Sequence, residues 1–238
     1  MRKIIMIGDS TMHFNDISTY PQTGWGQGLE LYCKRDVQII NLAQNGRSTK
    51  SFISEGLFDE ALSYITKGDF VICQFGHNDE KIEDKSRGTN KDLDFLSNLE
   101  FMHNEVIKKG ADIVFATSIS RRNFIDGLCI DSHLGYPQAM LNWANKNNYI
   151  CIDLNKLTLD LYNQLGEEAT KKFHMVFDKG IYKNYPNGLC DNSHLRMEGA
   201  IMVSDLFVKA IMQTNSAIKD FFINLDEIEE VNERMLEK

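Results

Sequence analysis

A serine near the N-terminus and an aspartate–histidine pair near the C-terminus are the residue types of a nucleophilic hydrolase. Gly8-Asp9-Ser10-Thr11 follows an apolar run, and Asp191-Asn192-Ser193-His194 precedes a long helical pattern. An aspartate three residues before a histidine on a turn can bond the ring Nδ1–H, which leaves Nε2 free to take a proton from a serine hydroxyl. Ser10 and Asp191 also have a purely structural interpretation, because both residue types commonly cap helices.

Two further segments carry groups that can stabilise an oxyanion. Gly46 lets the backbone approach a ligand closely and offer its N–H, although a plain turn glycine is the alternative interpretation. Asn78 carries an amide that donates hydrogen bonds without itself titrating. The flanking His77 and Asp79 cannot easily form a relay with each other, so we expect them to hold the loop.

The elements that must position these residues are predicted from hydrophobic patterning. Nearly continuous apolar runs predict five strands buried on both faces, at Lys3–Ile7, Val37–Leu42, Asp69–Phe75, Asp112–Thr117 and Tyr149–Leu154. Helical spacing of apolar residues predicts helices at Gly26–Lys34, Ser54–Thr66, Leu93–Lys109, Pro137–Lys146 and Arg196 to about Gln213. This alternation predicts one α/β domain over residues 1–238, a three-layer α/β/α sandwich with a five-stranded parallel sheet.

The predicted strands place the candidate residues together. Ser10, Gly46 and Asn78 follow the first, second and third strands in turn, and Asp191 and His194 precede the last long helix. Ligands of such sheets bind outside the carboxyl ends of the strands. We therefore expect all five residues to converge on one edge of the sheet.

The composition of the chain limits the classes of partner that the protein can bind. The 238 residues carry a net charge of −8 and no basic stripe, which argues against nucleic acid. No apolar stretch approaches the roughly 18–20 residues of a membrane helix, and the N-terminal apolar run is too short for a signal peptide, so we expect a cytoplasmic protein without a membrane partner. The five cysteines are scattered, which fits free thiols in a reducing compartment, and no cluster has metal-ligand spacing.

Together the four segments resemble the SGNH hydrolases, whose four blocks supply serine, glycine, asparagine and histidine. A narrower resemblance, to rhamnogalacturonan acetylesterases, is carried by Gly24-Trp25-Gly26, Asn45-Gly46-Arg47-Ser48, Gln74-Phe75-Gly76-His77-Asn78-Asp79, Arg121-Arg122 and Tyr136-Pro137-Gln138-Ala139-Met140. The resemblance implies a flavodoxin-like SGNH hydrolase fold and a catalytic triad of Ser10, Asp191 and His194. It further implies an oxyanion hole built from the Ser10 N–H, the Gly46 N–H and the Asn78 amide, and no metal or organic cofactor.

The resemblance also implies a substrate, an acetylated oligosaccharide of pectic type from which O-acetyl groups are removed. Four residues on loops are candidates for binding it: Trp25, Arg47, Arg122 and His133. Trp25 could stack on a pyranose face, and an arginine could pair with a galacturonate carboxylate. Core packing for Trp25 and surface charge for the arginines are the alternatives.

Other activities remain open on the sequence. A lipid or thioester hydrolase on the same scaffold would need an apolar acyl channel, a sugar-binding protein could have kept a silent pocket, and an acyltransferase would need an acceptor better placed than water. Residues 81–90 form a charged loop that is either a lid or a solvated segment. The tail around 224–238 predicts an acidic amphipathic helix, with Leu225, Ile228, Val231 and Met235 at helical spacing, that docks on the surface or mediates homo-oligomer contacts.

Overall fold

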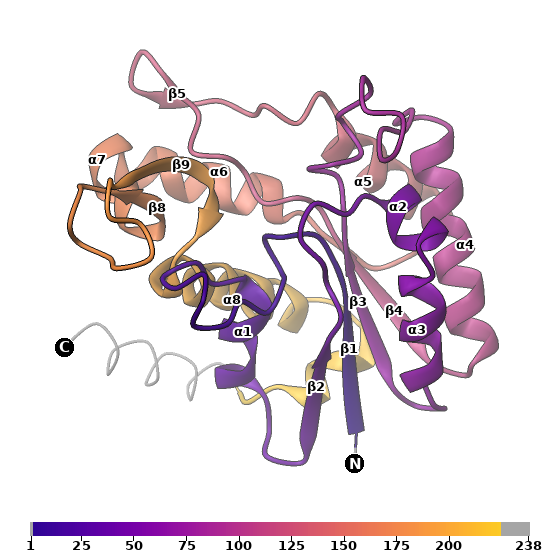
Figure 1. Cartoon of the computed structure of the whole chain (residues 1–238). Coiled ribbons are helices and arrows are strands. Elements are labelled where there is room, and N and C mark those ends of the chain that lie inside the picture. The colour runs from indigo at the N-terminus through magenta and orange to yellow at the C-terminus, as the bar shows by residue number, and fades with distance from the viewer. Residues whose placement is uncertain (1, 225–238) are drawn as a thin grey trace.

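The computed structural model describes residues 2–224, so the predicted tail helix lies outside the described residues (Figure 1). The main sheet contains β1 (Arg2–Gly8), β2 (Val37–Asn41), β3 (Phe70–Gln74), β4 (Asp112–Ala116) and β7 (Cys151–Ile152), in the order β2-β1-β3-β4-β7. All of its pairings are parallel. This is the flavodoxin-like strand order, which confirms the predicted fold class.

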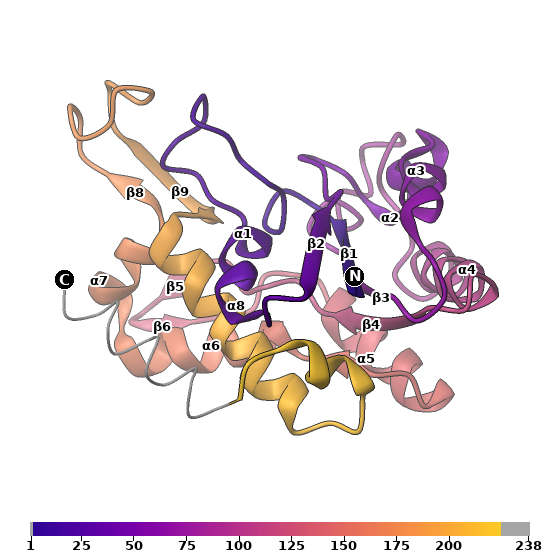
Figure 2. The ribbon, with the colours of Figure 1, turned by 90° about the horizontal axis from the view of Figure 1, so that it is seen from below.

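Helices cover both faces of the sheet (Figures 1 and 2). One face carries α2 (Thr49–Ser54), α3 (Leu57–Tyr64), α4 (Asp94–Lys108) and α5 (Tyr136–Asn147). The other carries α1 (Trp25–Leu29), α6 (Leu154–Leu165), α8 (Met197–Met212) and the 3₁₀ helix η3 (Ala217–Phe221). The short elements η1 (Glu30–Tyr32), α7 (Glu167–Thr170) and η2 (Lys171–Phe173) complete the helices of the described chain.

The central strands are apolar throughout because both of their faces are buried. In β1, Ile4 and Met6 point into the cluster under α1 and α8, whereas Ile5 and Ile7 point into the cluster under α2–α5. Successive side chains of a strand alternate between faces, so one continuous apolar run supplies both cores. None of the helices in residues 2–224 is long and apolar enough to cross a membrane.

Several element boundaries differ from the prediction. The predicted helix Ser54–Thr66 is the shorter α3, which begins after Gly56, whose φ of +78° is left-handed, and α2 before it was not predicted. Helix α6 was not predicted. It begins where a longer last strand was expected, because the Asp153 side chain accepts a hydrogen bond from Lys156 N and caps the helix.

Two small antiparallel ribbons form sheets of their own, separate from the main sheet. The first pairs β5 (Phe124–Ile125) with β6 (Leu128–Cys129), and the second pairs β8 (His174–Phe177) with β9 (Leu189–Leu195). The prediction placed Asp191 and His194 on a turn, but both lie within β9. This second ribbon therefore decides how these two residues face the main sheet.

Candidate active site

The turn that carries Ser10 is fixed at the end of β1 by buried polar contacts. Asp9 Oδ1 accepts hydrogen bonds from Thr11 N at 2.9 Å and Thr11 Oγ1 at 2.8 Å. Gln74, at the end of the neighbouring strand β3, donates its amide to Thr11 Oγ1 at 2.9 Å. A Cβ on Gly8 would lie only 2.7 Å from the Gln74 carbonyl oxygen, so the strand can approach this closely only with glycine there.

A bulge in β9 brings Asp191 and His194 to Ser10. Met175 of β8 pairs with Asp191, but the adjacent His174 pairs with Leu195, so residues 192–194 are extra on the β9 side. Asp191 Oδ1 accepts the backbone N–H groups of Ser193 at 2.8 Å and His194 at 3.1 Å, which tightens the bulge. The three-residue spacing of the predicted pair is thus a bulge geometry rather than a free turn.

The three side chains form a continuous hydrogen-bonded chain. Nδ1 of the His194 ring lies 2.7 Å from Asp191 Oδ2, and Nε2 lies 3.0 Å from Ser10 Oγ. Burial alone would raise the pKa of Asp191, but the His194 ring and the two backbone N–H groups hold it well below its usual value. The carboxylate stays ionised and can stabilise a protonated imidazole, which is what a serine nucleophile requires of its base.

Asn78 and Gly46 lie on the two loops that follow β3 and β2. Asn78 is buried, and its Nδ2 donates to the backbone oxygen of Arg47 at 3.0 Å, next to Gly46. An amide nitrogen carries two hydrogens, so the second remains available for a ligand. Gly46 has a φ of +75°, a left-handed conformation that turns the chain after β2.

His77 and Asp79, on either side of Asn78, face the protein interior. His77 Nδ1 lies 3.3 Å from Asp9 Oδ2, and burial lowers the pKa of His77 to about 4, so the ring is neutral. Asp79 accepts hydrogen bonds from Thr49 N, Thr49 Oγ1 and Thr89 Oγ1, and burial raises its pKa to about 7. Both residues hold the Asn78 loop. The His77–Asp9 contact also ties that loop to the Ser10 turn.

Two of the four predicted sugar contacts are wrong. Trp25 is fully buried, packs on Phe207 and donates its indole N–H to Gln74, so its ring cannot stack on a pyranose. His133 is also fully buried, with its ring nitrogens at Glu80 Oε2 and Ile119 O. Loop position in the sequence did not reveal that both rings turn inward.

The two arginines have roles other than the predicted ones. Arg122 is buried, and its guanidinium donates to Asn192 Oδ1 at 3.0 Å while its backbone N–H donates to Asn192 O at 2.9 Å, so it supports the bulge that holds His194. Arg47 forms a partly exposed ion pair with Glu55 at 2.7 Å, and only its backbone oxygen contacts Asn78. Neither side chain has the free guanidinium expected of a carboxylate-binding arginine.

Asp9 and Gln74 were not predicted as site residues. Asp9 is fully buried beside Ser10, and Gln74 links the Ser10 turn to Trp25. The signal available in the sequence was their position at the ends of two apolar strands, where a buried polar side chain needs a partner.

Two loops stand together beside the triad. The loop after Ser10 contacts the loop between β8 and β9, since Asn184 Nδ2 donates to Ile17 O and Tyr20 O, both at 2.9 Å (Figure 2). Tyr20 also packs edge-on against Tyr182. One loop leaves Ser10 and the other leads into Asp191, so their contact ties together the two chain segments that carry these residues.

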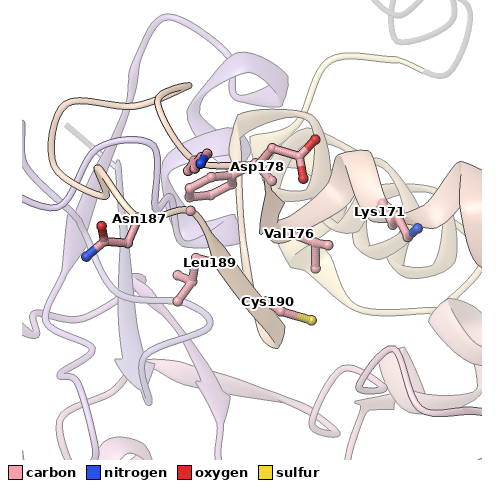
Figure 3. Close-up of a pocket in the computed structure, with 9 residues that line it drawn as sticks. Lys171, Val176, Asp178, Asn187, Leu189 and Cys190 are labelled. Carbon is pink, nitrogen blue, oxygen red and sulfur yellow. The ribbon is translucent and has the colours of Figure 1, made fainter.

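A separate surface pocket of about 1090 Å³ lies on the β8–β9 ribbon, and neither Ser10 nor His194 lines it (Figure 3). Cys190 lines this pocket, and Figure 3 shows it projecting to a different side of the strand from Leu189. Cys190 pairs with Val176 while Asp191 pairs with Met175, so their side chains leave opposite faces. Cys190 is therefore not part of the Ser10–His194–Asp191 chain, although it is adjacent to Asp191 in sequence.

Known proteins resemble this chain over almost its whole length. It is 34% identical to the rhamnogalacturonan acetylesterase RhgT of Bacillus subtilis, covering 96% of this chain and 97% of that protein. It is 30% identical to the probable rhamnogalacturonan acetylesterase YesY of the same organism, covering 91% of this chain and 98% of that protein. No protein-family model matches.

Solved structures share the fold. YxiM of Bacillus subtilis superposes with a TM-score of 0.75 at 27% identity, covering 91% of this chain and 57% of that one. An acetyl xylan esterase, AlAXEase, has a TM-score of 0.60 at 20% identity, covering 88% of this chain and 99% of that one, a likeness of fold alone.

A serine, a glycine, an asparagine and a histidine at the carboxyl edge of a flavodoxin-like sheet define the SGNH/GDSL class of hydrolases, and the molecule is a carboxylic ester hydrolase of this class. Within it, the chain belongs to the rhamnogalacturonan acetylesterase family.

Proposed function

We propose that this protein is a serine esterase that removes O-acetyl groups from carbohydrate, in particular from pectic oligosaccharides of the rhamnogalacturonan type. The observation that carries the proposal is the hydrogen-bonded chain from Asp191 through His194 to Ser10, with distances of 2.7 and 3.0 Å. The names of the relatives RhgT and YesY support the acetyl group and the sugar.

In the first step the Ser10 hydroxyl attacks the acetyl carbonyl carbon. His194 Nε2 accepts the hydroxyl proton, and the ionised Asp191 stabilises the imidazolium that forms. The imidazolium then gives this proton to the sugar oxygen as the carbon–oxygen bond breaks, which leaves an acetyl group on Ser10. In the second step water attacks the acetyl-serine with His194 again as base. The bond between Ser10 Oγ and the acyl carbon then breaks as the imidazolium returns the proton to Oγ, and acetate leaves.

The negative charge on the tetrahedral carbonyl oxygen needs hydrogen-bond donors. The backbone N–H groups of Ser10 and Gly46 and the free hydrogen of the Asn78 amide supply them in this proposal. Donors that are already held in place stabilise the transition state more than the ground state, because the charge exists only after attack. Asn78 is held by its bond to Arg47 O before any substrate binds.

The test compares wild type, Ser10→Ala and Ser63→Ala on p-nitrophenyl acetate and p-nitrophenyl octanoate, followed by acetate release from acetylated pectic oligosaccharides. Ser63 is the matched control, because its hydroxyl bonds Glu60 O on the surface of α3. We expect the acetyl ester and the oligosaccharide to be hydrolysed by wild type and Ser63→Ala, and not by Ser10→Ala.

Three outcomes would contradict the proposal. Preference for octanoate would indicate a lipid or thioester hydrolase. Turnover that survives in Ser10→Ala would remove the serine mechanism. Hydrolysis of p-nitrophenyl acetate without acetate release from the oligosaccharide would leave a serine esterase and refute the pectic substrate.

A further inference from the structure

Two cations converge on the side-chain oxygen of Asn78. Lys81 Nζ lies 3.1 Å from Asn78 Oδ1, and an Arg87 guanidinium nitrogen lies 3.4 Å from the same atom. Both belong to the charged loop 81–90, which the sequence left as either a lid or a solvated segment. The loop is in direct contact with the asparagine assigned to the oxyanion hole.

These contacts determine which way the Asn78 amide points. Lysine and arginine are donors only, so the atom that faces them must be the amide oxygen. The backbone oxygen of Arg47 is an acceptor only, so the atom that faces it must be Nδ2. All three partners agree on one orientation, and a flipped amide would lose all three bonds.

The loop 81–90 that supplies the two cations is held in place by contacts within the loop and with its neighbours. Arg87 Nε pairs with Asp84 at 2.7 Å, and Arg87 also reaches the Gly46 carbonyl oxygen at 3.5 Å, so one side chain spans the Gly46 and Asn78 segments. Thr89 N donates to Asp79 O at 2.9 Å, which anchors the far end of the loop. These contacts hold the loop against the segments that carry Gly46 and Asn78.

The Lys81 ammonium bonds an amide oxygen, whereas the ammonium of the nearby Lys91 bonds a carboxylate. Lys91 pairs with Asp92, whereas no ion pair with a carboxylate forms at the Lys81 ammonium within residues 2–224. A chain of net charge −8 offers many carboxylates, yet this ammonium bonds the Asn78 amide instead. Within residues 2–224, the only hydrogen-bond or ion-pair partner of the Lys81 ammonium is therefore the Asn78 amide oxygen.

We propose that Lys81 and Arg87 are positioning residues that brace the oxyanion hole, holding the Asn78 carboxamide with Nδ2 toward the substrate and strengthening it as a donor. A cation on the amide oxygen draws electron density away from the nitrogen, so the N–H groups become better donors. This inference rests on the proposed esterase mechanism.

The first experiment compares Lys81→Met, Lys81→Arg and the control Lys85→Met on p-nitrophenyl acetate. Lys85 lies in the same loop, and the contact made there is through its backbone oxygen, with Lys50. Loss of one charge that assists an oxyanion donor is expected to lower kcat roughly 10- to 50-fold in Lys81→Met, with KM nearly unchanged. Lys81→Arg should retain most of kcat, and Lys85→Met should match wild type.

A double-mutant comparison shows whether Lys81 acts through Asn78. In an Asn78→Ala background, Lys81→Met should cost less than about twofold in kcat, because the group it supports is gone. An undiminished effect in that background would overturn the positioning role.

The dependence of kcat on pH provides a further test, because a lysine with a purely structural role would not change it. Partial burial lowers the pKa of Lys81, and the nearby Arg87 and Arg121 lower it further, while Glu80 and Asp9 oppose the shift. We expect kcat of wild type to fall at alkaline pH as Lys81 loses its proton. In Lys81→Arg, whose guanidinium stays charged, this fall should disappear.

Nuclear magnetic resonance separates this inference from the proposed function. The side-chain amide signals of Asn78, identified by their loss in Asn78→Ala, should shift at pH 7 in Lys81→Met and stay in place in Lys85→Met. If no Ser10-dependent turnover exists, the proposed function fails, yet these spectra still decide whether the brace holds Asn78. Equal spectra and equal kcat for Lys81→Met and Lys85→Met would overturn the inference while leaving the esterase intact.

Discussion

The Ser10 hydroxyl and the His194 ring lie 3.0 Å apart although 184 positions separate them in the chain. One residue follows the first strand of the main sheet, and the other lies in the bulge of β9 that leads into α8. Their contact depends on α1 and α8 packing on the same face of the sheet, since Trp25 and Phe207 are in ring contact there.

Asp191→Asn should lower kcat roughly 10³- to 10⁴-fold with little change in KM, because the neutral amide cannot stabilise the imidazolium. Steady-state kinetics on p-nitrophenyl acetate measures it. Asp178→Asn, at the residue that follows β8, is the control and should behave like wild type. A loss of less than tenfold in Asp191→Asn would show that the carboxylate is not the partner of the base.

Asn78→Ala should lower kcat about 100- to 1000-fold while KM changes by no more than a few-fold, as expected for a donor used mainly in the transition state. Asn104→Ala removes an amide from the exposed side of α4 and should have no effect. Unchanged turnover in Asn78→Ala would remove Asn78 from the oxyanion hole.

Gly46→Ala should lower kcat roughly tenfold or more, and it should lower the free energy of unfolding by about 1 kcal/mol. The site has room for a methyl group, whose nearest neighbour would be an Arg87 nitrogen at 3.6 Å, so the cost comes from the φ of +75°. Gly56→Ala is the matched control, with a φ of +78° and open space, far from Ser10 in sequence and between α2 and α3. Equal kcat in the two variants would contradict a role for the Gly46 N–H.

Trp25→Phe should lower the free energy of unfolding by about 1–3 kcal/mol, because it removes buried area and the indole bond to Gln74. KM for an acetylated oligosaccharide should stay the same. Urea unfolding and steady-state kinetics measure the two quantities. A raised KM with unchanged stability would restore the sugar-stacking interpretation that the burial of Trp25 contradicts.

His174 should make the protein less stable as the pH falls. Burial lowers its pKa to about 3, and its Nε2 lies 2.9 Å from the Tyr162 hydroxyl, so the folded state keeps the ring neutral. Between the usual pKa of 6.5 and the folded value, only the unfolded state binds the proton, so acid favours unfolding. At pH 5 this proton binding lowers the free energy of unfolding by about 2 kcal/mol relative to pH 8.

Urea unfolding of wild type and His174→Gln at pH 5 and pH 8 tests this sign, because the difference between the two proteins isolates His174 from other titrating groups. Wild type should lose about 2 kcal/mol more than the variant over this interval. Identical losses would show that His174 does not stay neutral in the folded state.

The sequence by itself determined the succession of strands along the chain and which residue types follow them. Strands such as β1 and β3 are buried on both faces, so their apolar runs are visible locally, and Ser10 and Asn78 follow them at once. The helices α4, α5 and α8 were likewise predicted within a few residues, since one buried face produces a helical repeat.

Only the tertiary structure decided what depends on contacts between distant segments. The bulge in β9, the inward turn of Trp25 and His133, and the support of Asn192 by Arg122 each require a partner far away in sequence. A side chain on a loop looks the same in sequence whether it faces solvent or the core. Its burial and its hydrogen bonds are set by the packing of other elements, which local patterning does not contain.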